Sequence, residues 1–333
     1  KKINLLIVAS FPSKNKMVVG GIEKSSRILV RSKYFKQFNI TRFDTSQISN
    51  PPPNFLTRLV LALFRLYRFT KIFIRKKPDT ALIFCSDGAS AIEKGLMLII
   101  CRFFNVKSLI FPRAGNLITQ TNKNTLFKGL IKYLFSYSNI FLCQGPSWYS
   151  FAVESLKIEK SNVFIVNNWT ASKDLLAVGK NRIISEKVNN LEILYVGWLE
   201  KQKGINELLE SFLNLVKNYD IKIKFVGDGT LRRKIKEISI NNKIQNNISL
   251  TGWLSDQEII THLKSSDIFV LPSWYEGMPN SLIEALASGL PSICSSVGII
   301  PDYVIDGVNG LLIQPNDKLN LEKTIYRGAF FKC

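Results

Sequence analysis

The chain has 333 residues and a formal net charge of +20, and 46% of its residues are hydrophobic against 21% charged. A length of this order favours two domains, and the composition is that of a globular protein with a sizeable core, which excludes disordered, collagenous and disulfide-scaffold classes. The five cysteines are scattered and form no C-x-x-C pair, which argues against a zinc site and a secreted disulfide framework and favours a reducing cytosol.

The apolar segments are too short to cross a bilayer. No run reaches the ~18 residues that a spanning helix needs, because charges interrupt stretches such as residues 95–104. The opening residues 1–11 resemble a signal peptide, but they run into Pro12 and Lys14 without a small-residue cleavage site. We therefore expect a buried first strand at this position.

Nearly all of the excess positive charge lies in the first half of the chain. Residues 1–170 hold 26 Lys and Arg against 7 Asp and Glu, whereas residues 171–333 hold 19 against 18. This asymmetry indicates an anionic partner for the first half, either nucleic acid or a membrane surface. The sequence has no zinc finger, no RNP-type aromatic motif and no basic region leading into heptads, so we expect no nucleic-acid partner.

Residues 58–77 predict a basic amphipathic helix. At 100° per residue its basic side chains fall within an arc of about 140°, while apolar positions occupy the other faces; the basic residues are Arg58, Arg65, Arg68, Lys71 and Arg75. Such a helix can lie in the interface of an anionic bilayer, or it can be a core helix with a solvated basic face. Together with the charge of this half, it favours a cytoplasmic protein that is peripheral at the inner face of the cell membrane.

Short β-branched runs alternate with helical stretches along the whole chain. Their near-continuous apolar character suits parallel strands that are buried on both faces; the candidate strands are residues 3–10, 81–85, 108–111, 140–143, 163–166, 192–196, 223–226, 248–252, 268–271 and 291–294. Two doubly wound α/β domains follow. We place their boundary in the weakly periodic segment 171–190, which gives domains at 1–170 and 171–333.

Ligands of open α/β sheets bind beyond the carboxyl ends of the strands, so the strand-to-helix turns are the candidate sites. Gly20 and Gly21 precede one helix, and residues 196–212 form a lysine-bearing loop before another. The turn at residues 225–235 lacks the third glycine of a dinucleotide fingerprint, which argues against a simple dehydrogenase.

The turn at residues 271–291 carries the strongest signal. Glu276 lies in the loop after a predicted strand, and Pro279 and Asn280 are suited to open a helix. The free backbone N–H groups at the start of such a helix suit a pyrophosphate. Glu284 lies roughly 6 Å along the helix axis, where its carboxylate can accept two hydrogen bonds from a ribose diol. A glycoside hydrolase pair is the other reading of two carboxylates, but a phosphate-binding helix start makes it unfavourable.

These motifs resemble the family 4 glycosyltransferases of the GT-B fold, whose signature is a Glu-x7-Glu motif with an internal E-G-x-P. The matching positions are Glu276, Gly277, Pro279, Glu284, Ala285, Ala287, Gly289 and Pro291. The likeness extends through the VIDGVNGLLI stretch, which ends near Ile313, and back to VGWLEKQKG and GDGTLR. It covers nearly all of the second half, whereas in the first half it rests on the GGIEKSS loop and the order of elements.

The resemblance implies two Rossmann-like domains that face each other across a cleft, and transfer of a sugar from a UDP- or GDP-sugar with retention of configuration. It implies that Glu276 and Lys203 are catalytic. The implied donor-binding residues are Glu284, Gly277, Met278, Pro279, Asn280, Gly20, Gly21, Trp198, Gly252 and Trp253. The expected acceptor is a polyprenyl-diphosphate-linked saccharide of surface polysaccharide assembly, such as O-antigen, capsule or exopolysaccharide.

The sequence also departs from this family. Trp198 stands where the family often has an arginine that shares the phosphate charge with the lysine, and Arg113 is a candidate replacement or acceptor contact. The single histidine, His262, excludes Ser-His-Asp chemistry and multi-histidine metal sites. There is no D-x-D element, so we expect neither a metal nor a cofactor.

The family has further helices after the NGLLI strand, whereas here LNLEKTI is followed only by YRGAFFKC, so we expect the second domain to be truncated. Trp198 and this short end leave one alternative function open. It is a catalytically impaired protein that binds a nucleotide sugar at the membrane surface.

Overall fold

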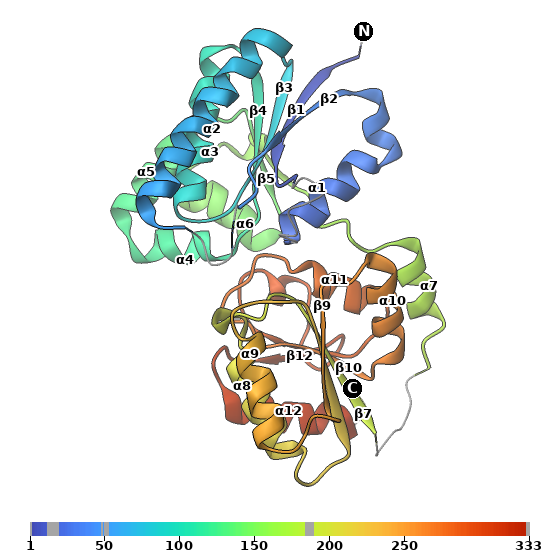
Figure 1. Ribbon diagram of the computed structural model, residues 1–333. Coiled ribbons are helices and arrows are strands. Elements are labelled where there is room, and N and C mark those ends of the chain that lie inside the picture. The colour runs from blue at the N-terminus through green and yellow to red at the C-terminus, as the bar shows by residue number, and fades with distance from the viewer. Residues whose placement is uncertain (1, 12–19, 48, 50–52, 184–189, 331–333) are drawn as a thin grey trace. The chain divides into compact units, whose positions relative to one another are not determined.

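The computed structural model describes residues 2–11, 20–47, 49, 53–183 and 190–330 (Figure 1). The chain forms two compact units, residues 1–169 and 170–333. Pro12, Lys14, Cys333 and the part of the predicted boundary segment at residues 184–189 lie outside the described residues.

The first unit is built on a six-stranded parallel sheet with the order β2-β1-β3-β4-β5-β6. Its strands are β1 (Asn4–Ala9), β2 (Asn39–Asp44), β3 (Thr80–Cys85), β4 (Lys107–Pro112), β5 (Ile140–Cys143) and β6 (Val163–Ile165). Its helices are α1 (Gly21–Arg31), α2 (Phe55–Lys76), α3 (Ala89–Phe103), α4 (Asn116–Lys123), α5 (Thr125–Phe135) and α6 (Pro146–Ser150).

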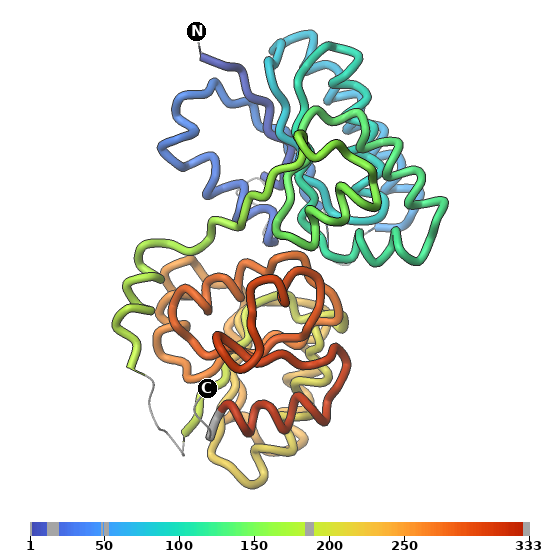
Figure 2. Tube along the Cα trace, turned by 180° about the vertical axis from the view of Figure 1, so that it is seen from behind, coloured from blue at the N-terminus to red at the C-terminus, as the bar shows by residue number. Residues whose placement is uncertain are grey.

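Helices cover both faces of this sheet. Figure 1 shows α2, α3 and α5 together on one side of the strands and α1 on the other, and Figure 2 shows the same separation from behind. Alternate residues of a strand point to opposite faces, and Leu5 and Ile7 of β1 pack with Ile22 and Leu29 of α1. The predicted first strand is therefore confirmed as a central, buried strand.

Helix α2 meets the rest of the unit through one narrow face. Phe69 and Phe73 are its buried side chains, and Arg65 donates two hydrogen bonds to the carboxylate of Glu93 on α3, at 2.7 and 2.8 Å. Arg65 of the predicted basic arc therefore faces α3 rather than solvent or a membrane, because it binds Glu93, which is only 6% exposed.

The second unit also has a six-stranded parallel sheet, with the order β12-β11-β10-β7-β8-β9. Its strands are β7 (Leu191–Val196), β8 (Ile221–Val226), β9 (Ile248–Gly252), β10 (Ile268–Leu271), β11 (Ser292–Ser295) and β12 (Leu311–Ile313). Its helices are α7 (Lys173–Lys180), α8 (Ile205–Leu215), α9 (Arg232–Asn241), α10 (Asp256–Ser265), α11 (Asn280–Ala287) and α12 (Lys318–Phe330).

The strand order of the second unit reverses between β7 and β10. Counted from β7, the order is 3-2-1-4-5-6, the arrangement in which ligands bind at the carboxyl ends of the first and fourth strands. The loops that follow β7 and β10 hold residues 197–204 and 272–279. The topology therefore places the two most informative sequence motifs next to each other.

The structure adds the edge strand β2 and the helix α7 to the predicted set. Strand β12 was absent from the candidate strands but lies in the NGLLI stretch that the resemblance implied to be a strand. Helix α7 lies in the weakly periodic segment 171–190, and its N-cap Ser172 accepts a hydrogen bond from the backbone N–H of Leu175. Along the described part of the chain, no helix combines the length and the apolar character that crossing a membrane requires.

Candidate active site in the second unit

Lys203 and Glu276 form a partly buried ion pair at the switch point of the second sheet. Lys203 lies in a 3-10 turn after β7, Lys201–Lys203, and its Nζ is 2.6 Å from Oε1 of Glu276, which follows β10. Ser273 donates its hydroxyl to the same carboxylate oxygen at 2.8 Å. Glu276 is 9% exposed, so a cation and a hydroxyl compensate its charge in a region of low solvent access.

Close approaches of the backbone hold the two loops together. The backbone N–H of Trp274 donates to the carbonyl of Gln202 at 2.9 Å. Gly204, with φ +70°, follows Lys203, and a Cβ at this position would lie 2.0 Å from the carbonyl oxygen of Pro272. Only glycine fits at this position. Gly204 therefore both ends the turn that carries Lys203 and lets this turn contact the loop that carries Glu276.

A second glycine supports the backbone of Glu276 itself. Gly298, with φ +58°, lies after β11, and a Cβ on it would stand 1.9 Å from the carbonyl oxygen of Glu276. The Glu276 carboxylate also acts on its neighbours. Burial and, secondarily, this negative charge raise the pKa values of Tyr195 and Cys294 above their ordinary values, so both groups are neutral near pH 7.

Helix α11 begins at Asn280, as the sequence predicted, directly after the loop of Glu276. Its N-cap, Pro279, makes no side-chain capping hydrogen bond, and the first backbone N–H groups of a helix are the groups that suit an anionic ligand. Gly277 and Met278 are buried in the preceding loop, and Glu284 is buried one turn inside the helix at 3% exposure.

Two tryptophans, which follow the carboxyl ends of β7 and β9, lie together. The rings of Trp198 and Trp253 meet edge to face with centroids 4.8 Å apart, and Tyr195 fixes the first of them by donating its hydroxyl to the Trp198 carbonyl at 2.8 Å. Arg232 of α9 donates to the carbonyl of Leu250 at 3.1 Å. An aromatic pair therefore lies where the resemblance implies contacts with the donor.

The remaining predicted residues belong to the first unit. Gly20 is the N-cap of α1, which begins at Gly21. Arg113 follows β4, and its Nη2 donates to the hydroxyl of Ser25 at 2.9 Å. Its guanidinium lies over three rings, at 4.9 Å from the Phe111 centroid, 5.2 Å from Trp169 and 5.9 Å from Phe84.

Arg113 is unusual because its charge is enclosed by aromatic rings. Burial lowers the pKa of Arg113 to about 9, and its Nη1 is buried with no hydrogen-bond partner among the described residues. Electron-rich ring faces compensate such a cation in part. The arrangement leaves this nitrogen able to bind an anionic or hydroxyl group.

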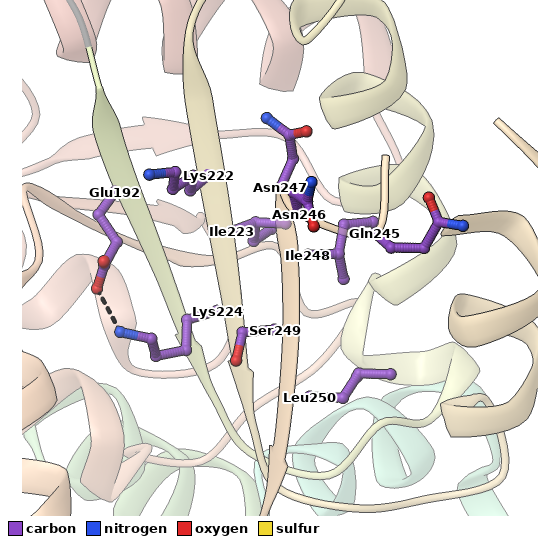
Figure 3. Close-up of a pocket in the computed structure, with 10 residues that line it drawn as sticks. All are labelled: Glu192, Lys222, Ile223, Lys224, Gln245, Asn246, Asn247, Ile248, Ser249 and Leu250. Atoms are coloured by element: carbon purple, nitrogen blue, oxygen red, sulfur yellow. Dashed lines mark hydrogen bonds and ion pairs between the residues drawn. The ribbon is translucent and has the colours of Figure 1, made fainter. Parts of the chain in front are cut away.

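Figure 3 shows a pocket elsewhere in the second unit that contains none of the predicted site residues. It lies along β7, β8 and the segment before β9, toward the amino ends of these strands, and includes Glu192, Lys222, Lys224 and Asn247. Two of its charged side chains neutralise each other, since Lys224 Nζ lies 2.6 Å from Glu192 Oε1.

Sequence reasoning missed Ser273, Gln202, Gly204 and Gly298. The serine had a usable signal, because a hydroxyl three residues before Glu276 can reach its carboxylate within one loop. The role of Gly298 depends on a backbone contact between segments far apart in the chain, for which the sequence has no local signal. Within the described ranges no group of three or more His, Cys, Asp or Glu side chains could hold a metal ion.

Comparison with known proteins agrees with this geometry. Residues 180–327 match the family described as Glycosyl transferases group 1. An uncharacterized glycosyltransferase of Methanocaldococcus jannaschii is 28% identical over 76% of this chain and 68% of its own length. The UDP-Gal:alpha-D-GlcNAc-diphosphoundecaprenol alpha-1,3-galactosyltransferase of Escherichia coli is 34% identical over 41% of this chain and 36% of its own length.

A solved lipopolysaccharide outer core galactosyltransferase, WaaB in its apo form, superposes with a TM-score of 0.66 at 17% identity, covering 98% of this chain and 90% of that one. This likeness shows the fold, two Rossmann-like units of the GT-B type. The chain spans 68% of the first curated relative that it matches and 36% of the second. Residues 180–327 are thus a domain of the glycosyl transferases group 1 family, carried by a chain with the GT-B fold.

Proposed function

We propose that this chain transfers a sugar from a nucleotide-sugar donor to a lipid-linked saccharide during the assembly of a bacterial surface polysaccharide. The observation that carries the proposal is the cluster of Lys203, Glu276 and Ser273 beside the start of α11, at the switch point of a group 1 domain. This cluster combines a cation, a buried carboxylate and the backbone N–H groups of a helix start, which are the groups that a sugar diphosphate needs.

In this proposal the diphosphate lies at the start of α11 and Lys203 neutralises it as the leaving group. The bond between the anomeric carbon and the diphosphate oxygen breaks, the acceptor hydroxyl forms the new bond on the same face, and its proton leaves with the diphosphate. Glu276 binds the donor sugar through hydroxyl groups, and Glu284 binds the ribose. The proposed attack on the same face makes the transfer retaining, and Lys203 and the helix start supply the positive charge that a metal would otherwise supply.

The proposed donor is a UDP- or GDP-sugar, and the proposed acceptor carries a polyprenyl diphosphate. The name of the Escherichia coli relative supports both assignments, because it specifies UDP-galactose and a diphosphoundecaprenol acceptor. Arg113 of the first unit is the proposed contact for an acceptor phosphate, since its buried Nη1 has no acceptor within the described structure. The proposed location is the cytoplasmic face of the membrane.

Calorimetric titration with UDP, GDP and ADP tests the donor site. Glu284→Ala should weaken nucleotide binding by about 2 kcal/mol, because it removes a charge-assisted contact, whereas Glu276→Gln should keep binding and reduce transfer. Glu237→Ala is the matched control, since Glu237 lies on the surface of α9 and pairs with Arg233 of the same helix. Wild-type behaviour of both site variants would contradict the assignment.

Trp198 supports the second candidate function, a nucleotide-sugar-binding protein with impaired catalysis. It occupies the position at which the resembled family often has a phosphate-binding arginine, so Lys203, already paired with Glu276, lacks that second cation beside it. Turnover of a radiolabelled nucleotide sugar distinguishes the two functions. Nucleotide binding without any turnover would favour the second.

A further inference from the structure

Helices α2, α3 and α5 expose an unusual amount of apolar surface. Thirteen of the twenty-five large hydrophobic side chains exposed in the described structure lie on these three helices. They are Phe55, Leu56, Leu59, Val60, Leu63, Phe64, Tyr67, Ile74, Leu96, Phe103, Leu126, Leu130 and Tyr133. Single exposed apolar residues need no explanation, but a concentration of this kind marks an interaction surface.

The exposed residues follow helical spacing on each element. On α2, Leu56, Val60, Leu63 and Tyr67 recur every three or four residues, and so do Leu126, Leu130 and Tyr133 on α5. Such spacing gives each helix an outward apolar stripe. Helix α3 packs against both α2 and α5, and Figure 1 shows all three on the same side of the first sheet.

Basic side chains flank the stripe of α2. Arg68, Lys71 and Arg75 are exposed, and on a helical wheel they fall within about 60° of one another, at one border of the apolar positions. Arg102 of α3 and Lys132 of α5 are also exposed. Cationic side chains beside an apolar stripe are the composition of a helix that lies in a membrane interface.

No carboxylate of the three helices opposes this charge on their outer side. Their sequences contain one acidic residue, Glu93, and it is buried against Arg65 of α2 and Lys94 of α3. Burial disfavours the charged form of Glu93, but the hydrogen bond from Arg65 and the field of Lys94 outweigh it and hold its pKa below the ordinary value. The negative charge is therefore fixed inside, and the outer side of these helices carries only positive charge.

We propose that the exposed sides of α2, α3 and α5, hereafter the three-helix face, bind an anionic lipid bilayer. The proposal deepens the peripheral location in the proposed function and names the surface. A second copy of the chain would bring two positive faces together, and nucleic acid would gain nothing from thirteen apolar side chains. An anionic bilayer matches both properties, because its headgroups attract the cations and its acyl boundary accepts the apolar stripes.

Vesicle flotation of the full chain tests the proposal without any nucleotide. Wild-type protein should float with phosphatidylcholine vesicles that contain phosphatidylglycerol, bind pure phosphatidylcholine more weakly, and dissociate as salt rises. The charge variant Arg68→Glu, Lys71→Glu and Arg75→Glu should reduce binding at least about a hundredfold. Its matched control is Arg31→Glu, Lys33→Glu and Lys36→Glu, which makes the same charge change on exposed residues at the end of α1 and just after it.

Two variants test the apolar side chains of α2 and of α5 separately. Leu56→Ser, Val60→Ser and Phe64→Ser on α2, and Leu126→Ser, Leu130→Ser and Tyr133→Ser on α5, should each weaken binding at least about tenfold. Their control is Ile305→Ser, Val308→Ser and Leu319→Ser, three exposed apolar residues of the second unit. All of the replaced side chains are exposed, so folding should survive, and circular dichroism checks it.

Each outcome supports or overturns the proposal. Wild-type protein that ignores anionic vesicles at low salt overturns it, as does a wild-type dimer that the serine variants convert to monomer. An α5 variant that binds as wild type does would overturn the three-helix face in favour of α2 alone. A chain that floats but binds no nucleotide would refute the proposed donor site and leave this surface intact.

Discussion

The position of Glu276 depends on glycines that have no functional group of their own. Its carboxylate is held by Lys203 and Ser273, but its backbone position depends on Gly298, which approaches its carbonyl from a segment after the next strand. In the same way, Gly204 lets the turn that carries Lys203 approach the carbonyl of Pro272. In both places the missing side chain allows one loop to touch another, so the site is set by backbone packing.

Gly298→Ala should therefore impair the site without removing any of its functional groups. A Cβ at 1.9 Å from the Glu276 carbonyl cannot be accommodated, and φ +58° adds strain, so the loop must move and the unfolding free energy should fall by more than about 1 kcal/mol. Gly129→Ala, where a Cβ meets nothing within 4 Å, is the control.

The measurement is nucleotide affinity together with urea unfolding of both variants. Gly298→Ala should lose stability and affinity or transfer, while Gly129→Ala, inside helix α5, should keep affinity and transfer and lose no stability. Unchanged stability and transfer in Gly298→Ala would show that the loop of Glu276 does not depend on this contact.

The sequence provided candidate residues for this site but not the glycines that support their loops. Glu276 and Glu284 were proposed from their positions after a strand and inside a helix start, and Lys203 was proposed from the resemblance to the glycosyltransferase family. The structure brings Lys203 and Glu276 together although 73 positions separate them. Gly298 could not be found, because its role arises only when the carboxyl ends of two strands are adjacent in the folded sheet.

At the scale of elements, buried strands were easier to predict than edge strands. Central strands such as β1 and β3 are apolar along their length because both of their faces are covered. The edge strand β2 has mixed burial and contains Arg42 and Asp44, so it gave no continuous apolar run. Helix α2 was predicted as a helix, but the direction of Arg65 depended on a carboxylate of α3 that lies 28 residues away.

The pair of Arg65 with Glu93 should fasten α2 to α3. Arg65→Met leaves the buried carboxylate with Lys94, whose Nζ lies 3.4 Å from it, and the loss of one partner from a buried pair costs about 3 kcal/mol. Arg68→Met removes an exposed charge of the same helix and should change stability by less than about 0.5 kcal/mol.

Chemical denaturation followed by circular dichroism compares the two variants. The double variant Arg65→Met, Glu93→Met removes both charges, and it should recover much of the stability that Arg65→Met loses, because the uncompensated carboxylate is gone. If Arg65→Met proves as stable as Arg68→Met, the pair does not hold the helix.

At the scale of the whole molecule, the chain is two units with separate sheets, and they differ in charge and in chemistry. The first contains the three-helix face and Arg113, and the second contains the group 1 domain with Lys203, Glu276 and Glu284. The positive charge of the first half, +19 of the total +20, therefore belongs to the unit that does not carry the proposed nucleotide site. In the two proposals, attraction to an anionic surface and binding of an anionic donor therefore fall to different units.

Nucleotide should accordingly stabilise one unit more than the other. A ligand at 100 times its Kd stabilises the state that binds it by about 2.7 kcal/mol, and the proposed contacts with base, ribose and diphosphate lie in the second unit. Replacing Trp148 and Trp169 with Phe leaves Trp198, Trp253 and Trp274, all of the second unit. Tryptophan fluorescence of this variant then reports the unfolding of that unit, whereas circular dichroism reports both.

Addition of the best-binding nucleotide should move the fluorescence transition to higher urea and split it from the remaining dichroic change, which belongs to the first unit and should stay in place. Glu284→Ala in the same background is the control and should reduce the displacement, because the proposed ribose contact is lost. A single transition that moves as a whole in both signals would show instead that the two units unfold as one cooperative body, and the nucleotide would then stabilise the entire chain.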